Sequence, residues 1–163
     1  MRAHTIVYPG TFDPITKGHV DLAERAAKLF DTVVIGIGVS SKKQPLFTTE
    51  ERLALAEAAL DHLDNVRVEC FSGLLTHFVK TQDSHCVLRG VRSVTDFEYE
   101  SQLANMNRTM YPEFETLFLT PAENLGFISS SLVREIALMG GEFDAFVPAV
   151  VAKALRDLSL IHI

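Results

Sequence analysis

Short apolar runs alternate with segments in which apolar residues recur every three or four positions, along almost the whole chain. The runs are rich in valine and isoleucine and too short for helices, which favours strands buried on both faces. The sequence therefore predicts five strands, at residues 4–8, 32–39, 66–70, 86–88 and 115–119.

The segments between these runs have the spacing of helices. Val20, Ala23, Ala27 and Phe30 repeat at helical intervals after the first run. A threonine followed by glutamate three positions later, at residues 48–51, is a capping box and opens a helix that extends to about residue 60. Further helices are predicted at residues 73–81, 96–110, 129–139 and 148–158.

One predicted helix, at 96–110, carries a stripe of large apolar side chains. Such a stripe more often faces a protein core than a cofactor, so we expect it to be buried. The stripe consists of Tyr99, Leu103, Met106 and Met110.

The alternation of strands and helices predicts an α/β fold. We expect a single-domain, Rossmann-like, doubly wound sheet of five parallel strands, with helices on both faces and a C-terminal helix. The sequence has no internal repeat, low-complexity stretch or linker, so residues 1–163 are interpreted as one domain. Gly140 and Gly141 mark a turn within it.

Composition narrows the class of protein. The net charge of −6 argues against general binding to nucleic acid or to acidic membrane surfaces. The longest apolar run, at 33–39, is too short to span a bilayer, and the first residues lead into a strand with no signal-peptide pattern. Cys70 and Cys86 suit buried, reduced thiols. These features together predict a cytoplasmic protein.

The most informative segment is YPGTFDPITKGH, at residues 8–19. It lies where the first strand gives way to the first helix, and ligands of open α/β sheets bind at such junctions. Gly10 and Gly18 permit close backbone approach, and His19 stands at the start of the helix. Because helix N-termini favour phosphate, this segment predicts a cradle for the phosphates of a nucleotide.

Two later segments repeat the same theme. Arg89 and Arg92 flank a glycine turn after the fourth strand, and three serines at 129–131 open a helix after the fifth. Arginine suits bidentate phosphate contact. No nucleophile–base motif is present, so positioning and charge stabilisation are favoured over a covalent intermediate.

With its other markers, this chain resembles the phosphopantetheine adenylyltransferases of the nucleotidyltransferase superfamily, which carry a T/HxGH motif. The resemblance covers almost the whole chain, and separate blocks follow in family order. Besides residues 8–19 the blocks are PLF at 45–47, EER at 50–52, RGVR at 89–92, DFEYESQ at 96–102, MN at 106–107 and FISSS at 127–131.

The resemblance implies adenylyl transfer from ATP to 4′-phosphopantetheine, giving dephospho-coenzyme A and pyrophosphate. The reaction would proceed by in-line attack, with Mg²⁺ held mainly through the phosphates of ATP and with no protein metal ligands. It also implies a homohexamer with coenzyme A as a feedback inhibitor.

The resemblance assigns roles to particular residues. The catalytic group would be His19, as transition-state stabiliser, with Thr11, Lys43 and Arg92. Phosphopantetheine would be held by Thr11, Lys43, Leu75 and Arg89. The ATP site would comprise Thr11, Phe12, His19, Gly90, Val91, Arg92, Glu100, Leu125, Gly126, Phe127, Ile128, Ser129, Ser130 and Ser131.

Two positions distinguish this chain within the superfamily. Thr16 replaces a histidine common in relatives and favours this branch. Leu125 and Gly126 stand where many members have Trp or Tyr followed by Ser, so the expectation for these two residues rests on backbone contacts to the nucleotide. Two alternatives stay open: another small nucleotidyltransferase, such as one acting on nicotinate mononucleotide, and a catalytically inactive nucleotide-binding module.

Overall fold

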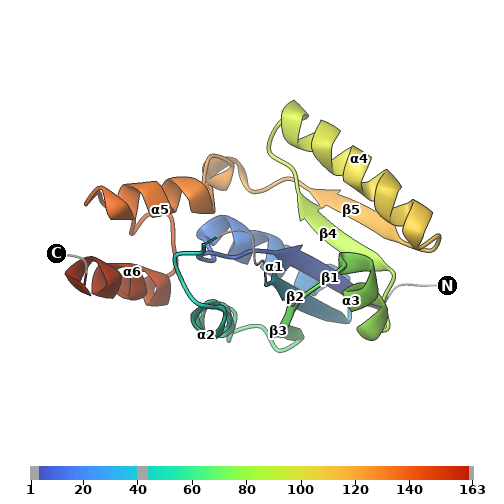
Figure 1. The fold of residues 1–163 in the computed structure, drawn as a ribbon, viewed down its shortest axis with the longest axis horizontal. Coiled ribbons are helices and arrows are strands. Elements are labelled where there is room, and N and C mark those ends of the chain that lie inside the picture. Colours follow the sequence, from blue (N-terminus) through green and yellow to red (C-terminus); the bar gives the residue numbers. More distant parts are fainter. Residues whose placement is uncertain (1–3, 40–43, 162–163) are drawn as a thin grey trace.

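The chain forms one five-stranded parallel sheet in the order β3-β2-β1-β4-β5 (Figure 1). The computed structural model describes residues 4–39 and 44–161. All strand pairs are parallel, and the register aligns Tyr8 of β1 with Ile35 of β2. The strands are β1 (Thr5–Gly10), β2 (Thr32–Gly38), β3 (Val66–Phe71), β4 (Cys86–Gly90) and β5 (Glu115–Leu119).

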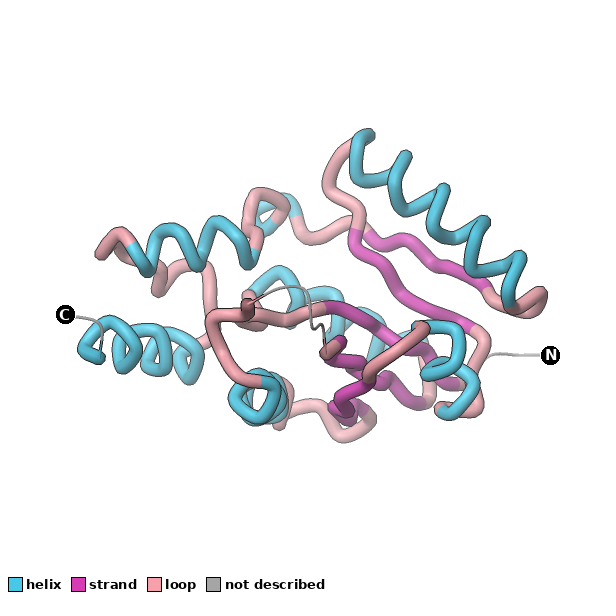
Figure 2. The backbone as a smooth tube through the Cα atoms, in the orientation of Figure 1, coloured by secondary structure: helices cyan, strands magenta, loops and turns pink. Residues whose placement is uncertain are grey.

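Helices lie on both sides of this sheet (Figure 2). A short 3₁₀ helix, η1 (Glu123–Leu125), follows β5, and α5 and α6 then pack against each other beside the sheet (Figure 1). The α-helices are α1 (Lys17–Leu29), α2 (Thr49–Ala59), α3 (Leu75–Thr81), α4 (Val94–Met110), α5 (Ser130–Leu138) and α6 (Ala149–Ile161). The predicted doubly wound α/β fold with a C-terminal helix is confirmed.

The two faces of the sheet are covered separately because successive strand residues point to opposite faces. Ile6 and Tyr8 of β1 belong to a large core with α1, α2, α5 and α6. Val7 packs on the other face with Val34 and with Phe78 of α3. Burial on both faces explains why the central strands read as unbroken apolar runs.

Gly36, in the middle of β2, makes room for a side chain of α3 to pack on the second face of the sheet. A Cβ at this position would lie 2.7 Å from the ring of Phe78. The glycine therefore creates a thin place in the strand that an aromatic side chain of α3 fills, as glycine within a strand often indicates.

The prediction that the apolar stripe of α4 is buried is wrong. Tyr99 is 63% exposed, Met106 is 60% exposed and Met110 is also exposed. The buried residues of this helix are Glu100, Ala104 and Asn107, which lie on the neighbouring face. Tyr99, Met106 and Met110 point outward because the sheet-facing side of α4 is occupied by these smaller and polar residues, whereas Leu103 is half-buried.

Both cysteines, Cys70 and Cys86, are free. Burial raises the pKa of the Cys86 thiol to about 12, which makes it unreactive as a nucleophile. In the described part of the chain, no helix combines the length and the apolar character needed to cross a membrane.

Candidate active site

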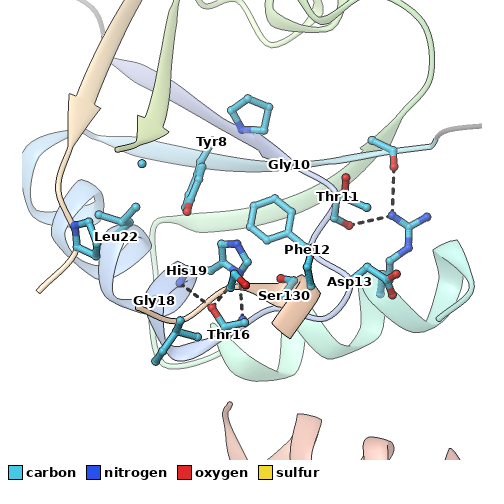
Figure 3. A pocket seen from close by; sticks show the side chains of 18 of the residues that line it. Tyr8, Gly10, Thr11, Phe12, Asp13, Thr16, Gly18, His19, Leu22 and Ser130 are labelled. Carbon is cyan, nitrogen blue, oxygen red and sulfur yellow. Dashed lines mark hydrogen bonds between the residues drawn. The ribbon is translucent and has the colours of Figure 1, made fainter. Parts of the chain in front are cut away.

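A cleft of about 390 Å³ opens at the carboxyl ends of β1 and β4 (Figure 3). From β1 the chain adds β2 and β3 on one side of the sheet and then β4 and β5 on the other, so the topological switch point lies between β1 and β4. The cleft lies at this point. This is where open α/β sheets bind their ligands. Its walls come from β1 and the following loop, the start of α1, the end of β4, the 121–131 segment and α2.

His19 is fixed at the start of α1 by a reciprocal capping box. The Thr16 hydroxyl accepts from the backbone N–H of His19 (3.3 Å), and the Thr16 backbone N–H donates to Nδ1 of the ring (3.0 Å). Because Nδ1 is an acceptor in this arrangement, the proton of the neutral ring resides on Nε2. The capping box therefore presents Nε2–H as a hydrogen-bond donor.

The His19 ring is neutral at pH 7. Burial and then the positive charge of Arg92 lower its pKa to about 4. Phe12 and Tyr8 pack around it, with ring centroids 4.8 Å and 6.3 Å from the imidazole. Figure 3 shows these three rings gathered in the cleft. His19 is therefore a fixed neutral donor rather than a cation.

Two helix N-termini direct unpaired N–H groups at this cleft. Within the described residues, the backbone N–H groups of Gly18, Ser130 and Ser131 have no acceptor, and all three residues line the cleft. The Ser129 hydroxyl caps α5 by accepting from Leu132 N–H (3.1 Å), whereas the Ser130 hydroxyl donates to the Pro14 carbonyl (2.9 Å). The starts of α1 and α5 thus offer amides and positive dipole ends to the same cleft.

Arg89 lies at the end of β4 and is held by a bidentate ion pair. Its Nε and Nη2 donate to the two carboxylate oxygens of Glu100, each at 2.7 Å. Burial works against the charge of Arg89, but the hydrogen bonds and charge of Glu100 outweigh it, so its pKa is raised. The guanidinium is thus permanently charged and fixed in orientation.

Arg92 bridges two loops at the rim. Its Nη1 donates to the Ile128 carbonyl (2.8 Å), and its backbone N–H donates to the Asp96 carboxylate (3.1 Å). The contact ties the turn after β4 to the start of α5, which are far apart in sequence.

The structure brings most of the predicted site residues to the cleft. Those that line it are Thr11, Phe12, His19, Arg89, Gly90, Arg92, Leu125, Ile128, Ser129, Ser130 and Ser131. Five do not line it: Leu75, Val91, Glu100, Gly126 and Phe127. Lys43 lies outside the described residues.

Two of these five residues lie at an adjoining cavity of about 10 Å³, on the α3–α4 side of the sheet. Leu75 and Glu100 line it, and Arg89 lines both cavities. The rest of its lining is apolar at Val87, Leu103 and Ala104 and polar at Asn107 and Thr116. Glu100 thus contacts the cleft only through Arg89. Phe127 is exposed and packs edge-on against Phe146.

Sequence reasoning assigned no role to two arginines that line the cleft, Arg52 and Arg134. Arg134 Nη1 donates to the Asp13 carbonyl (2.7 Å), and Nη2 donates to the Ser131 hydroxyl (3.2 Å). Arg52 contacts the carbonyls of Thr11 and Gly38. The sequence marked Arg52 only as part of the EER block. The backbone contacts of both arginines are made with residues distant in the chain, which sequence patterns do not show.

The carboxylate of Asp13, which lines the cleft, is already used for structure. Asp13 accepts from the backbone N–H groups of Leu46 (2.8 Å) and Phe47 (3.0 Å). Among residues 4–39 and 44–161, no three acidic, histidine or cysteine side chains gather as metal ligands.

A parallel sheet whose switch-point cleft carries a TxGH helix start and a second helix N-terminus defines an α/β enzyme of the nucleotidyltransferase type. The chain belongs to the cytidylyltransferase-like family, whose model matches residues 7–136. A solved structure from Vibrio parahaemolyticus, described as a nicotinate-nucleotide adenylyltransferase, is similar in fold, with a TM-score of 0.69 and 15% identity. The match covers 94% of this chain and 99% of that one.

Proposed function

We propose that this enzyme transfers the adenylyl group of ATP to 4′-phosphopantetheine, giving dephospho-coenzyme A and pyrophosphate. The observation that carries the proposal is the position of Arg89. Its fixed guanidinium borders both the main cleft and the cavity that Leu75 lines. A cation at this junction suits a phosphate whose attached chain runs into the second cavity.

The second cavity matches the chemistry of a pantetheine arm. Four of its lining residues are apolar, and Asn107 is an amide that could bind an amide of the ligand. The other polar lining residues are Arg89, Glu100 and Thr116. At about 10 Å³ the cavity has room for no more than one water molecule. Leu75 and Leu103 would therefore have to move apart to admit the arm. A nicotinate mononucleotide has no such flexible chain, which favours phosphopantetheine.

The proposed chemistry is a single displacement. An oxygen of the 4′-phosphate attacks the α-phosphorus of ATP, the bond from that phosphorus to the bridging oxygen breaks, and pyrophosphate leaves with the electron pair. His19 donates Nε2–H to the charge that develops on the phosphates. The open N–H groups at the starts of α1 and α5 add donors that need no reorganisation during the reaction.

The other proposed roles follow from position. Thr11 would orient the acceptor phosphate, and Arg92 would bind the phosphates of ATP. Lys43, which lies outside the described residues, is assigned to the acceptor from the sequence resemblance alone. Mg²⁺ would be held mainly by phosphate oxygens and would neutralise part of their charge. Arg134, beside Ser131, is placed to contact the leaving pyrophosphate.

A second candidate is nicotinate mononucleotide adenylyltransferase. The fold similarity to the Vibrio structure supports it, and the same cleft and the same His19 chemistry would serve it. The two candidates differ in the acceptor alone. An inactive module that only binds nucleotide is the third.

Pyrophosphate release from ATP and Mg²⁺, measured with each acceptor in turn, separates the three candidates. We expect release with phosphopantetheine and dephospho-coenzyme A as the second product. Release only with nicotinate mononucleotide would move the substrate assignment. ATP binding without release with either acceptor would point to the inactive module.

We also propose that the enzyme assembles with copies of itself, as a homohexamer. The apolar residues Tyr99, Met106 and Met110, which are exposed and recur at helical spacing on α4, support self-association, because exposed apolar clusters mark interaction surfaces. Coenzyme A is proposed as an inhibitor, since it contains the same pantetheine arm as the product.

A further inference from the structure

Arg52 is a buried arginine without a carboxylate partner among the described residues. It is only 2% exposed. Its Nη1 donates to the carbonyls of Thr11 (2.8 Å) and Gly38 (3.1 Å), and its Nη2 donates to the Thr49 hydroxyl (3.2 Å). Its Nε has no acceptor in the described structure. Burying a guanidinium this way is unfavourable, so a role other than stability is indicated.

The carbonyl that Arg52 holds belongs to the Thr11–Phe12 peptide. In a trans peptide the C=O and N–H point in opposite directions, so the N–H of Phe12 points away from Arg52. This N–H has no acceptor among the described residues, although the Phe12 side chain is buried and the residue lines the cleft. The peptide therefore offers a free donor on the side opposite to Arg52.

The same peptide is conformationally strained. Phe12 has a φ of 49°, in the left-handed region that disfavours a bulky residue. Such a conformation persists only where its surroundings impose it. Rotating the Thr11–Phe12 peptide would relieve the strain, but it would turn the carbonyl away from Arg52 and the N–H away from its present direction.

Other contacts in this loop hold different peptides. Arg134 bonds the Asp13 carbonyl, and Ser130 bonds the Pro14 carbonyl. In the described part of the chain, the Thr11 carbonyl is bound by Arg52 alone. Because Gly38 ends β2, the same guanidinium also ties the ends of two adjacent central strands together.

We propose that Arg52 is a positioning residue that locks the Thr11–Phe12 peptide so that the Phe12 N–H donates to a bound phosphate. This proposal rests on the proposed function, because it takes the bound phosphate to be a phosphate of ATP. Arg52 acts through the peptide and does not touch the reacting atoms. Its charge also adds to the positive potential of the cleft.

The first test uses the unmodified protein and inorganic pyrophosphate. The ¹⁵N–¹H signal of Phe12 is followed as pyrophosphate is added. We expect it to shift together with the signals of Gly18 and Ser130. A Phe12 signal that stays in place while the other two move would overturn the proposal, whatever the true acceptor is.

The second test compares Arg52→Met, Arg52→Lys and Arg156→Met, a control on the surface of α6 that pairs with Asp144. Arg52→Met should lose the pyrophosphate-induced shift of Phe12 and lower kcat by about 10- to 100-fold. The KM of the acceptor should stay within about three-fold. Arg52→Lys should recover part of both, because an ammonium can donate to the same carbonyls. Arg156→Met should behave like the unmodified protein.

A folded Arg52→Met variant with normal kcat and a normal Phe12 shift would also overturn the proposal. Where Arg52→Met does not fold, the Lys variant and the pyrophosphate titration decide. Neither titration needs an acceptor substrate. A different acceptor in the pyrophosphate-release assay would therefore change the proposed function without affecting the role of Arg52.

Discussion

At the scale of single residues, the proposed role of His19 depends on its position and not on charge. Its ring is neutral, and Nδ1 is occupied by the Thr16 backbone. Only Nε2–H remains to meet a phosphate, so removing the ring removes one donor from the transition state. We expect His19→Ala to leave the fold intact and to lower turnover by about 10²-fold or more. The exposed His77 of α3, mutated to Ala, is the control, and near-normal turnover of His19→Ala would remove the ring from the mechanism.

The low pKa of His19 also predicts how stability depends on pH. The unfolded ring titrates near 6.5 and the folded ring near 4, so the unfolded state binds more protons between these values. Stability from this residue is complete above pH 6.5 and is lost as the pH falls to 4, by at most about 3 kcal/mol. Urea unfolding of the protein and of His19→Asn across this range should show a shallower slope for the variant. Equal slopes would contradict the low pKa.

Individual residues were predictable where a motif held them and unpredictable where a distant partner did. The TxGH segment placed His19, Thr11 and Phe12 in the cleft. Arg52 was invisible as a site residue because its partners are backbone carbonyls that the fold brings near it. The place of Glu100 could not be predicted either, because its ion pair with Arg89 depends on how α4 packs on the sheet.

At the scale of elements, α1 and α2 begin with the same capping box. Thr16 caps α1 and Thr48 caps α2, each accepting from the N–H three residues later. Replacing either threonine with Ala should cost about 1 kcal/mol of stability. Only Thr16→Ala should also lower turnover, because the Thr16 hydroxyl lies 3.2 Å from Nδ1 of His19. Urea unfolding and turnover of both variants test this prediction. Equal turnover of the Thr16 and Thr48 variants would show that the cap of α1 does not affect catalysis.

Local sequence patterns predicted the existence of helices and strands more accurately than they predicted the buried face of each helix. The capping box at 48–51 and the apolar runs gave α2 and all five strands. The strand ends moved, since β1 reaches Gly10 and β4 reaches Gly90 through pairing with neighbouring strands that a single run does not reveal. For α4, periodicity found a helix but the wrong buried face. The polar Glu100 is buried there because the sheet face beneath it carries Arg89, with which it forms an ion pair.

At the scale of the whole molecule, the cleft depends on the strand order. Residues 8–19, 89–92 and 128–131 meet only because β4 pairs with β1 and crosses back past two strands. The rule for switch points predicted this meeting from the alternation of elements. The second cavity could not be predicted, because it depends on how closely α3 and α4 pack on the far face.

The exposed stripe on α4 predicts self-association. Tyr99, Met106 and Met110 would become buried between copies, so a charge at the centre should oppose assembly. We expect Met106→Glu to give a smaller particle than the unmodified protein in light scattering after size-exclusion chromatography. Arg156→Glu, on α6, is the surface control. A monomeric unmodified protein would contradict this role for the stripe.

The link between the two cavities predicts the last effect, on substrate preference. Arg89→Ala should raise the KM for phosphopantetheine while the KM for ATP stays within about three-fold, because the guanidinium borders the second cavity. Glu100→Gln should give a weaker version of the same defect, since it loosens Arg89 without removing its charge. The two changes act through one pair, so the double variant should be no worse than Arg89→Ala. A collapse of ATP affinity with normal use of phosphopantetheine would instead assign Arg89 to the nucleotide, and the second cavity would lose its proposed occupant.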